Sequence, residues 1–208
     1  MRYRIKICGL TDPAQALVAA EAGADAIGLV FVARSRRVVS VQRAAEIAAV
    51  LPPFVATVGL FVDPLPEEVE QTLAGCRLDF LQFHGREDAA FCSGFGLPYL
   101  KAIGMAAGVD PRREMDAHPG ARGFLLDSHA AGKMGGTGHP FDWSLISAPL
   151  ERPWLLAGGL DARNVVAALA QTRPFGVDVS TGVESKPGQK DPNLVREFVN
   201  MVRQVERG

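Results

Sequence analysis

Short apolar runs recur along the chain and alternate with segments whose apolar residues follow helical spacing. Each run has the length of a buried strand. The eight runs span Tyr3–Cys8, Ala26–Phe31, Phe54–Leu60, Leu78–Gln82, Tyr99–Ile103, Gly123–Asp127, Trp154–Ala157 and Gly176–Val179. Helical spacing is clearest over Pro13–Ala22, Val41–Val50, Pro66–Leu73 and Ala162–Ala170. The pattern predicts strand and helix in turn, eight times.

The spacing of the predicted strands favours a closed barrel. Their ends fall at residues 8, 30, 60, 82, 103, 127, 157 and 179, which lie 21 to 30 residues apart. Continuous apolar strands are typical of a parallel sheet that is covered on both faces. Thr11-Asp12-Pro13 and Asp161 offer helix caps. We therefore expect an α/β fold, a single-domain (β/α)₈ TIM barrel over residues 1–208. An open doubly wound sheet is the alternative, but no GxGxxG follows the first strand.

The charge balance restricts the partners of the protein. The 208 residues are 48% hydrophobic and carry 22 Lys and Arg against 23 Asp and Glu. A chain with net charge −1 and no basic block is a poor candidate for binding nucleic acid. Small phosphate-bearing ligands remain possible because they need only a local pocket.

The lack of a targeting signal and the usage of cysteine predict a cytoplasmic protein that does not enter a membrane. The amino terminus lacks the apolar region of a signal peptide. The longest uncharged stretch, residues 47–62, is broken by Pro52-Pro53 and Gly59, so we interpret it as a helix end followed by a strand. Three cysteines without a CxxC pair argue against a disulfide framework.

In a (β/α)₈ barrel the active site lies at the carboxyl ends of the strands, so the residues at the predicted strand ends are the candidates for chemistry. They are Cys8-Gly9, Arg34 to Arg37, Val62-Asp63, Gln82 with His84-Gly85, Lys101, Asp127, Gly158-Gly159 and Ser180-Thr181-Gly182.

Two adjacent glycine-containing loops predict a phosphate site. Gly158 and Gly159 follow the seventh predicted strand, and Ser180, Thr181 and Gly182 follow the eighth. Loops at these two places commonly bind phosphate in barrels through converging backbone N–H groups. The alternative is that the glycines only make tight turns.

Cys8 and Asp127 are candidates for proton transfer. A thiol at the end of the first strand can act as a base if Lys6 or a helix N-terminus lowers its pKa. A carboxyl group at a partly desolvated strand end can act as an acid. Both have structural alternatives, since free Cys often packs as a small hydrophobe and Asp often forms turns. The glycine-rich residues 131–138 after Asp127 are either a mobile lid or a linker.

Other polar residues give weaker signals. Arg36 and Arg37 can clamp a carboxylate or form a solvated turn. The histidines, His84 among them, form no HExxH motif and no metal-binding spacing with cysteines, so we expect no metal. Cys76 and Cys92 lie in helical stretches and are expected to be structural.

Seven motifs in order together resemble phosphoribosylanthranilate isomerases. They are Lys6-Ile7-Cys8-Gly9-Leu10-Thr11, Gly28-Leu29-Val30-Phe31 with Ser35-Arg36-Arg37, Val58-Gly59-Leu60-Phe61-Val62, Leu81-Gln82-Phe83-His84-Gly85, Leu125-Leu126-Asp127, Leu156-Ala157-Gly158-Gly159-Leu160 and Val177-Asp178-Val179-Ser180-Thr181-Gly182-Val183-Glu184. The resemblance runs from the first strand to the last helix. Phe83 stands where the family's motif has Leu.

The resemblance implies an Amadori rearrangement in tryptophan biosynthesis without cofactor or metal. In this family Cys8 would be the general base and Asp127 the general acid. Arg37 would clamp the anthranilate carboxylate, with Arg36 as the substitute. The loops at Gly158-Gly159 and Ser180-Thr181-Gly182 would hold the phosphate. His84 and Asp178 are given only supporting roles near the ligand.

Several alternatives remain open at this point. Indole-glycerol-phosphate synthase would be expected to have an amino-terminal extension and a catalytic lysine. An isomerase that also acts in the histidine pathway would have aspartate in place of Cys8. A noncatalytic barrel that binds a sugar phosphate would need neither Cys8 nor Asp127. The expected partner is a small phosphorylated aminosugar, and the chain is expected to be a monomer or a homodimer.

Overall fold

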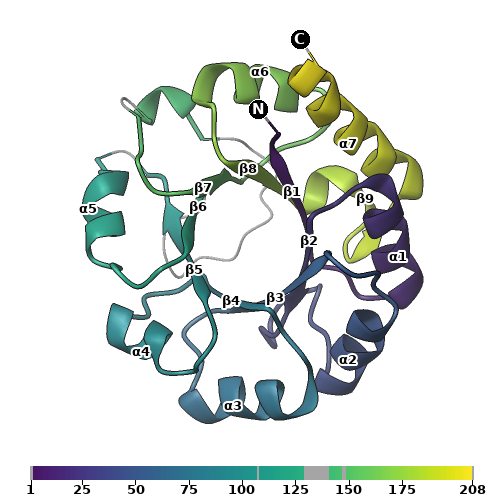
Figure 1. Cartoon of the computed structure of the whole chain (residues 1–208), viewed down its shortest axis with the longest axis vertical. Helices are drawn as coiled ribbons and strands as arrows, with labels where there is room; N and C mark the ends of the chain where they lie inside the picture. Colours follow the sequence, from purple (N-terminus) through teal and green to yellow (C-terminus); the bar gives the residue numbers. More distant parts are fainter. Residues whose placement is uncertain (1, 107, 129–140, 147–148, 208) are drawn as a thin grey trace.

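The computed structural model describes residues 2–106, 108–128, 141–146 and 149–207. In these ranges eight parallel strands form a closed barrel, and the last strand pairs with the first (Figure 1). The strands are β1 (Arg4–Cys8), β2 (Ala26–Val30), β3 (Ala56–Phe61), β4 (Phe80–Phe83), β5 (Tyr99–Gly104), β6 (Gly123–Asp127), β7 (Trp154–Leu156) and β8 (Gly176–Val179). The predicted barrel is confirmed, and the open sheet is wrong because β8 hydrogen-bonds to β1.

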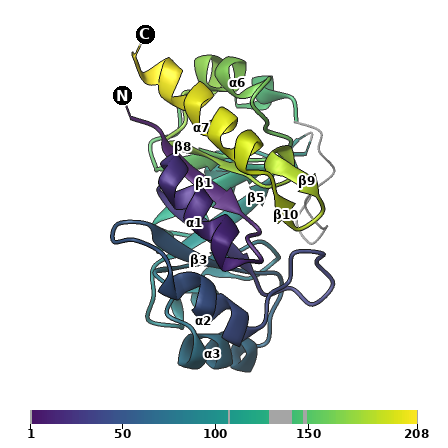
Figure 2. The same ribbon diagram turned by 90° about the vertical axis from the view of Figure 1, so that its right-hand side faces the viewer.

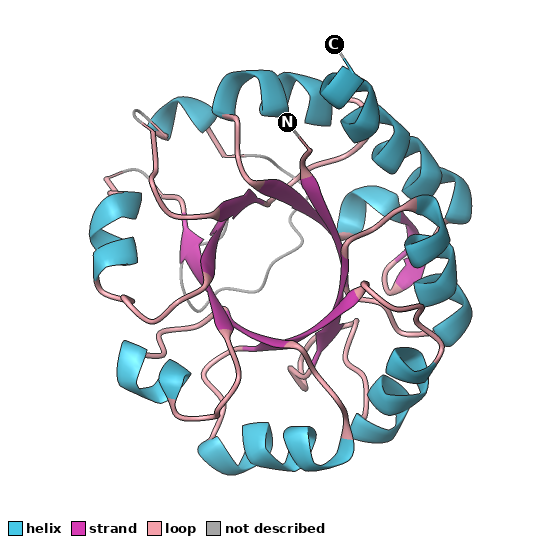
Figure 3. Cartoon of the chain, viewed as in Figure 1, coloured by secondary structure: helices cyan, strands magenta, loops and turns pink. Residues whose placement is uncertain are grey.

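The helices form a ring around the barrel (Figure 3). They are α1 (Pro13–Ala22), α2 (Val41–Ala49), α3 (Pro66–Gly75), α4 (Ala89–Ser93), α5 (Pro111–Asp116), α6 (Val165–Thr172) and α7 (Pro192–Arg207). Between β6 and β7 the described residues contain only a 3₁₀ turn, η1 (Trp143–Leu145). The expected alternation of strand and α-helix is therefore seen in full everywhere except after β6.

A short hairpin interrupts the last strand-helix unit. The 3₁₀ turn η2 (Thr181–Val183) follows β8 and leads into β9 (Glu184–Lys186) and β10 (Gln189–Lys190), which pair antiparallel. Figure 2 shows this hairpin at the end of the barrel toward which β1 runs, away from the two termini. The hairpin therefore lies on the side of the strand carboxyl ends, where function is expected.

The side chains of each barrel strand alternate between the outer core and the interior. Ile5 and Ile7 of β1 belong to the large cluster that packs under the helices, which places Lys6 and Cys8 inside. A second, smaller cluster fills part of the interior, with Ala102, Leu125, Leu155 and Ala157. Apolar residues of β5, β6 and β7 thus fill one part of the interior, while β1 contributes polar groups to another.

The predicted starts of the third strand and of the helix over residues 162–170 are wrong. Phe54 was expected to begin the third strand, but it follows two prolines, adopts φ +71° and is fully exposed, so β3 begins at Ala56. The sixth helix was expected from Ala162, but the Asp161 carboxylate accepts hydrogen bonds from the N–H groups of Arg163 and Asn164. These bonds form a turn, and α6 begins only at Val165.

The start of β4 and the place of Cys76 also differ from the prediction. The strand expected from Leu78 begins at Phe80, since the Asp79 carboxylate accepts hydrogen bonds from the backbone and hydroxyl of Thr57. Cys76 was expected within a helix, but it follows the last residue of α3 in an extended conformation. The predicted cap at Asp12 is confirmed, because its side chain accepts a hydrogen bond from the Ala14 N–H at 2.9 Å.

Candidate active site

Cys8 ends β1 and faces the barrel interior. It is 5% exposed and pairs with Gly28 of β2 in the sheet register. A Cβ atom on Gly28 would stand 2.6 Å from the Cys8 Sγ, so the glycine leaves the space that the thiol occupies. The sequence therefore combines a thiol with the small neighbour that it needs at the mouth of the barrel.

Burial raises the pKa of the Cys8 thiol, because the thiolate loses solvation. The positive charges of Lys6 and Lys190 oppose this rise, and Asp178 adds to it. The expected positive charge is thus present, but it does not outweigh burial. A raised pKa favours the thiol form of Cys8, and only the thiolate form could accept a proton.

Lys6 and Asp178 form a buried ion pair directly below Cys8. They are register partners on β1 and β8, and Lys6 Nζ lies 2.6 Å from Asp178 Oδ1. Their side chains are 2% and 9% exposed. Burial alone would lower the pKa of Lys6, but the charges and hydrogen bonds of Asp178 and Cys8 together outweigh it and raise that pKa. Asp178 therefore holds a lysine, a contact that the sequence analysis missed.

Asp127 ends β6 and lies across the barrel mouth from Cys8, because β7 and β8 separate the two strands around the closed sheet. Its Oδ2 lies 3.5 Å from His84 Nε2, and its Oδ1 accepts a hydrogen bond from the Ser128 hydroxyl at 3.3 Å. The structure thus brings together Asp127 and His84, two of the predicted site residues, from different strands.

Gln82 sets the orientation of the His84 ring. Its amide Nε2 lies 3.2 Å from His84 Nδ1. With the amide in this orientation Nε2 donates to Nδ1, and a neutral ring then carries its proton on Nε2, toward Asp127. Burial lowers the pKa of His84, while the charge of Asp127 opposes this effect. His84 is therefore a neutral donor near the candidate acid.

The two candidate arginines differ in their surroundings. Arg36 is exposed, whereas the Arg37 side chain is only 15% exposed and lies over the loop after β1. Gly9 in this loop has φ +78°, and a Cβ there would stand 2.4 Å from Arg37 Cδ. A glycine is required at this position both for its backbone conformation and for the approach of the arginine.

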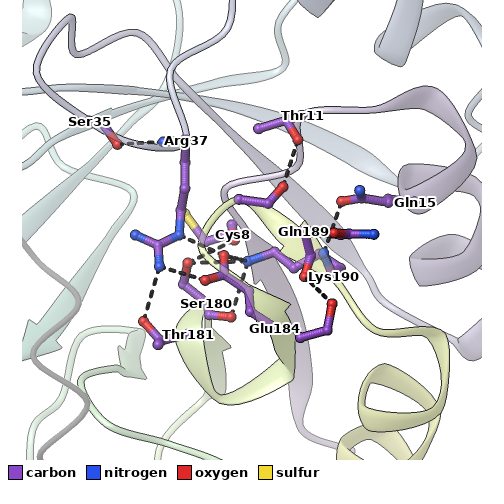
Figure 4. Close-up of polar contacts among 12 residues, drawn as sticks. Cys8, Thr11, Gln15, Ser35, Arg37, Ser180, Thr181, Glu184, Gln189 and Lys190 are labelled. Carbon is purple, nitrogen blue, oxygen red and sulfur yellow. Dashed lines mark hydrogen bonds and ion pairs between the residues drawn. The ribbon is translucent and has the colours of Figure 1, made fainter.

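Arg37 belongs to a buried cluster that includes the β9–β10 hairpin (Figure 4). Its Nε and Nη2 each donate a hydrogen bond of 2.7 Å to one carboxylate oxygen of Glu184. Lys190 Nζ donates to Glu184 Oε1 at 2.8 Å and to the backbone oxygen of Ser180 at 3.0 Å. Because of these bonds, Glu184 has a lowered pKa although burial raises it, and the Glu184 hydrogen bond raises the pKa of Arg37.

The two predicted phosphate loops lie side by side after adjacent strands. Gly158 and Gly159 have φ values of +83° and +65°, which favour glycine. A Cβ on Gly182 would lie 2.0 Å from the Leu160 oxygen, so the loops touch at this glycine. The Ser180 hydroxyl donates to the Cys8 backbone oxygen at 3.0 Å, and the Thr181 hydroxyl accepts from Arg37 Nη2 at 3.3 Å. Both hydroxyls thus have protein partners.

Glu184 and Lys190 are the main residues that the sequence analysis did not assign. Glu184 ends the last quoted motif, and Lys190 lies six residues further on. A basic residue in a short hairpin directly after the eighth strand could have been a signal for this cluster. The predicted lid, residues 131–138, lies outside the described residues.

The remaining predictions concern metals, membranes and the other cysteines. Within the described ranges no three His, Cys, Asp or Glu side chains are grouped so as to hold a metal ion. No described helix has both the length and the apolar character of a membrane span. All three cysteines are free, and burial raises the pKa of Cys92 to about 12. Cys92 thus has the inert environment expected of a structural cysteine.

Comparison with known proteins identifies the family. A family model described as N-(5'phosphoribosyl)anthranilate (PRA) isomerase matches residues 5–201. The chain belongs to this family. An N-(5'-phosphoribosyl)anthranilate isomerase of Pseudomonas fluorescens (strain Pf0-1) is 53% identical over 200 residues, covering 96% of this chain and 98% of the relative. One of Nitrosomonas europaea is 48% identical over 206 residues, covering 99% and 98%.

Solved structures of the family have the same fold. Phosphoribosyl anthranilate isomerase from Thermotoga maritima matches with a TM-score of 0.88 and 37% identity, covering 97% of this chain and 99% of that one. A structure of the enzyme in complex with reduced 1-(o-carboxyphenylamino)-1-deoxyribulose 5-phosphate matches with a TM-score of 0.86 and 36% identity over the same shares. The resemblance inferred from the seven motifs is confirmed.

Proposed function

We propose that this chain isomerises N-(5-phosphoribosyl)anthranilate to 1-(2-carboxyphenylamino)-1-deoxyribulose 5-phosphate by an Amadori rearrangement. Membership of the family supports the reaction. The observation that carries the mechanism is the position of Cys8 and Asp127 at the ends of β1 and β6, on opposite sides of one barrel mouth. Enzymes of this fold carry their chemistry there. We assign the whole of residues 1–208 to one catalytic domain.

Asp127 is the proposed general acid. Its proton passes to the ring oxygen of the ribose while the bond between that oxygen and C1′ breaks, and the nitrogen lone pair forms the Schiff base. Asp127 thereby becomes a carboxylate. The Nε2–H of His84, 3.5 Å away, faces the charge that develops. Such a donor is more favourable to the transition state than to the starting state, which is the condition for catalysis.

Cys8 is the proposed general base. Its thiolate removes the proton from C2′ of the iminium, and the C–H electrons form the enolamine double bond, which neutralises the iminium nitrogen. Loss of the O2′ proton and addition of a proton at C1′ then give the ketone. The reaction leaves Cys8 protonated and Asp127 ionised, so one proton must return to Asp127 before the next turnover. No oxidant or reductant is needed, and we propose no cofactor and no metal.

The two anionic ends of the substrate have separate proposed sites. Arg37 binds the anthranilate carboxylate, and the backbone N–H groups of the loops at Gly158-Gly159 and Ser180-Thr181-Gly182 bind the phosphate. Anchoring both ends would hold the sugar between the acid and the base. Arg36 is the less favoured carboxylate site because its side chain is exposed. His84 and Asp178 support the site without a proposed covalent role.

The proposal extends to location and assembly. We place the enzyme in the cytoplasm, in line with biosynthetic chemistry, and expect it to bind neither nucleic acid nor membranes. A solved relative from Thermotoga maritima, from which monomers were generated, is described as dimeric. For this chain a monomer or a homodimer is proposed, and sedimentation velocity of the purified protein distinguishes them.

The function is tested by mixing the purified protein with freshly generated phosphoribosylanthranilate and following the loss of its anthranilate-type fluorescence. Cys8→Ser and Asp127→Asn are each expected to lower kcat by roughly 10²- to 10⁴-fold, the usual contribution of a positioned acid or base. Cys76→Ser is the matched control, because Cys76 follows α3 and lies outside the barrel interior.

Each outcome has a distinct meaning. Rapid turnover that is lost in the Cys8 and Asp127 variants but kept in the Cys76 variant supports the isomerase. A wild-type rate equal to the uncatalysed background would overturn it. If such an inactive protein still binds the phosphorylated ligand in calorimetry, the noncatalytic sugar-phosphate-binding barrel takes its place.

A further inference from the structure

The cluster around Glu184 contains more positive than negative charge. Arg37 and Lys190 both contact the Glu184 carboxylate, which leaves a surplus of one positive charge while Lys190 is protonated. Burial lowers the pKa of Lys190, and the contact with Glu184 opposes this effect. The side chains of Glu184 and Lys190 are 3% and 1% exposed, so solvent hardly screens them. Nearby, Lys6 and Asp178 cancel each other, and the raised pKa of Cys8 leaves its thiol neutral.

Glu184 occupies one edge of the Arg37 guanidinium. The Nε and Nη2 groups form this edge, and both point at the carboxylate (Figure 4). The second proton of Nη2 faces the Thr181 hydroxyl at 3.3 Å, a long hydrogen bond. In the part of the chain that the structure describes, Nη1 donates no hydrogen bond. An incoming carboxylate can therefore bind only at the edge formed by Nη1 and Nη2.

We infer that Glu184 and Lys190 are positioning residues for recognition of the substrate carboxylate: Glu184 fixes which edge of Arg37 is presented, and Lys190 supplies the charge that makes this edge attractive to an anion. The inference rests on the proposed function, in which Arg37 binds the anthranilate carboxylate. The inference adds two residues that do not touch the ligand. Glu184 orients Arg37, and Lys190 adjusts the charge around it.

Charge balance explains why Lys190 is needed. Arg37 paired with Glu184 alone is a neutral unit, and a second carboxylate approaching it would also meet the negative charge of Glu184. Lys190 lies 2.8 Å from Glu184 Oε1 and offsets that charge. The ammonium group makes further bonds to the backbone oxygen and hydroxyl of Ser180, so it is held rigidly. Arg37 then keeps its net attraction for an anion.

The expected effect follows from Coulomb's law. The two charges are the Lys190 ammonium and the carboxylate of a bound ligand. For an assumed separation of about 8 Å and an effective dielectric constant of about 20, their attraction changes the dissociation constant of the ligand by roughly thirty-fold. Removing the charge of Lys190 should weaken binding of a carboxylate ligand by about this factor. Lys190 also contacts Ser180 in the proposed phosphate loop, and loss of that contact should weaken the ligands with and without the carboxylate equally. Only the effect of charge on the carboxylate should change the ratio of the two affinities.

The test compares two ligands by calorimetry. One is reduced 1-(o-carboxyphenylamino)-1-deoxyribulose 5-phosphate, and the other is the same compound with an unsubstituted phenyl ring. The ratio of their affinities measures the contribution of the carboxylate. Lys190→Met should reduce this ratio roughly thirty-fold. Lys186→Met, which removes an exposed lysine from the same hairpin, is the control and should leave the ratio within about threefold of wild type.

A double variant separates charge balance from structural support. Glu184→Gln combined with Lys190→Met restores the surplus of one positive charge on Arg37, so the ratio should return to near the wild-type value. A purely structural role for Lys190 predicts that the double variant is at least as impaired as Lys190→Met alone. Urea unfolding of each variant shows that the ratio is measured on folded protein.

The outcomes distinguish the inference from the proposed function. If wild type binds both ligands equally, the carboxylate site of the proposed function fails. If wild type prefers the carboxylate ligand but Lys190→Met keeps that preference, only the present inference is overturned. It is also overturned if Lys190→Met weakens both ligands equally, or if the double variant shows no recovery.

Discussion

Two buried charge clusters lie next to Cys8, and they differ in their charge balance. Lys6 and Asp178, on β1 and β8, form a pair of one cation and one anion. Arg37, Glu184 and Lys190 form a group of two cations and one anion. A balanced buried pair satisfies itself and needs no ligand, whereas a group with surplus charge has an unmet attraction for an anion. The difference separates a cluster that supports the fold from one that is ready for a substrate.

A third cluster, outside the barrel, supports this distinction. Lys101 Nζ lies 2.9 Å from Glu87 Oε2 and donates to the backbone oxygen of Gly85 at 2.7 Å. Glu87 also accepts hydrogen bonds from the N–H groups of Gly85 and Asp63. This balanced pair holds the loop that carries His84. Balanced pairs thus position strands and loops, whereas the unbalanced cluster carries the proposed carboxylate site.

Breaking the balanced pair should have the largest effect on stability. Asp178→Asn leaves Lys6 buried without its counter-charge, and removal of one partner of a buried pair costs about 3–5 kcal/mol. Urea unfolding at pH 7 measures the loss. Asp116→Asn, at an exposed position at the end of α5, is the control and should change stability by less than about 0.5 kcal/mol. A loss below about 1 kcal/mol at Asp178 would remove the structural role from the pair.

Removing the charge of Arg37 from the unbalanced cluster should affect substrate binding. Arg37→Gln removes the charged donor for the carboxylate, and a hydrogen bond between charged groups contributes about 2 kcal/mol, so KM should rise roughly thirty-fold. Arg36→Gln should raise KM much less because Arg36 is exposed. Steady-state kinetics with phosphoribosylanthranilate measure both, and Arg43→Gln on α2 is the control. A larger effect at Arg36 would move the carboxylate site to that residue.

The surplus charge should also reach Cys8. Burial raises the pKa of Cys8 and Lys190 opposes the rise, so Lys190→Met should raise it further. Only the thiolate is alkylated, and its population grows about tenfold per pH unit below the pKa. Alkylation of Cys8, followed by peptide mass spectrometry between pH 6 and 9, should increase with pH and be slower in Lys190→Met than in Lys186→Met. Equal rates of Cys8 alkylation in the two variants would mean that Lys190 acts on Arg37 but not on the pKa of Cys8.

The smallest expected effect concerns the pKa of His84. The two members of the Lys6–Asp178 pair shift this pKa in opposite directions. Asp178 raises the pKa of His84 and Lys6 lowers it, so burial determines the lowered value. The unfolded chain then binds a proton below about pH 6.5 that the folded chain does not, and stability falls as the pH falls. His84→Gln should reduce this slope by at most about 1.4 kcal/mol per pH unit. Urea unfolding between pH 5 and 7 measures it, and an unchanged slope would contradict the lowered pKa.

The sequence by itself determined the alternation of parallel strands and helices, favoured the closed barrel, and indicated where its site would lie. Apolar runs at barrel spacing can be satisfied only by strands covered on both sides, and the cap at Asp12 fixes where α1 begins. The ends of the strands then indicate Cys8 and Asp127 as candidates, because side-chain alternation and parallel direction bring strand ends together. These features are local or periodic, which is why one sequence reveals them.

Only the tertiary structure decided the charge clusters. Lys6 and Asp178 are 172 residues apart, and Arg37 and Glu184 are 147 residues apart, so closure of the barrel and placement of the β9–β10 hairpin are needed to pair them. The sequence indicated Arg37 as a clamp but not which edge of its guanidinium stays available. Electrostatic pairing depends on distances through space, and a linear pattern of charges carries no information about those distances.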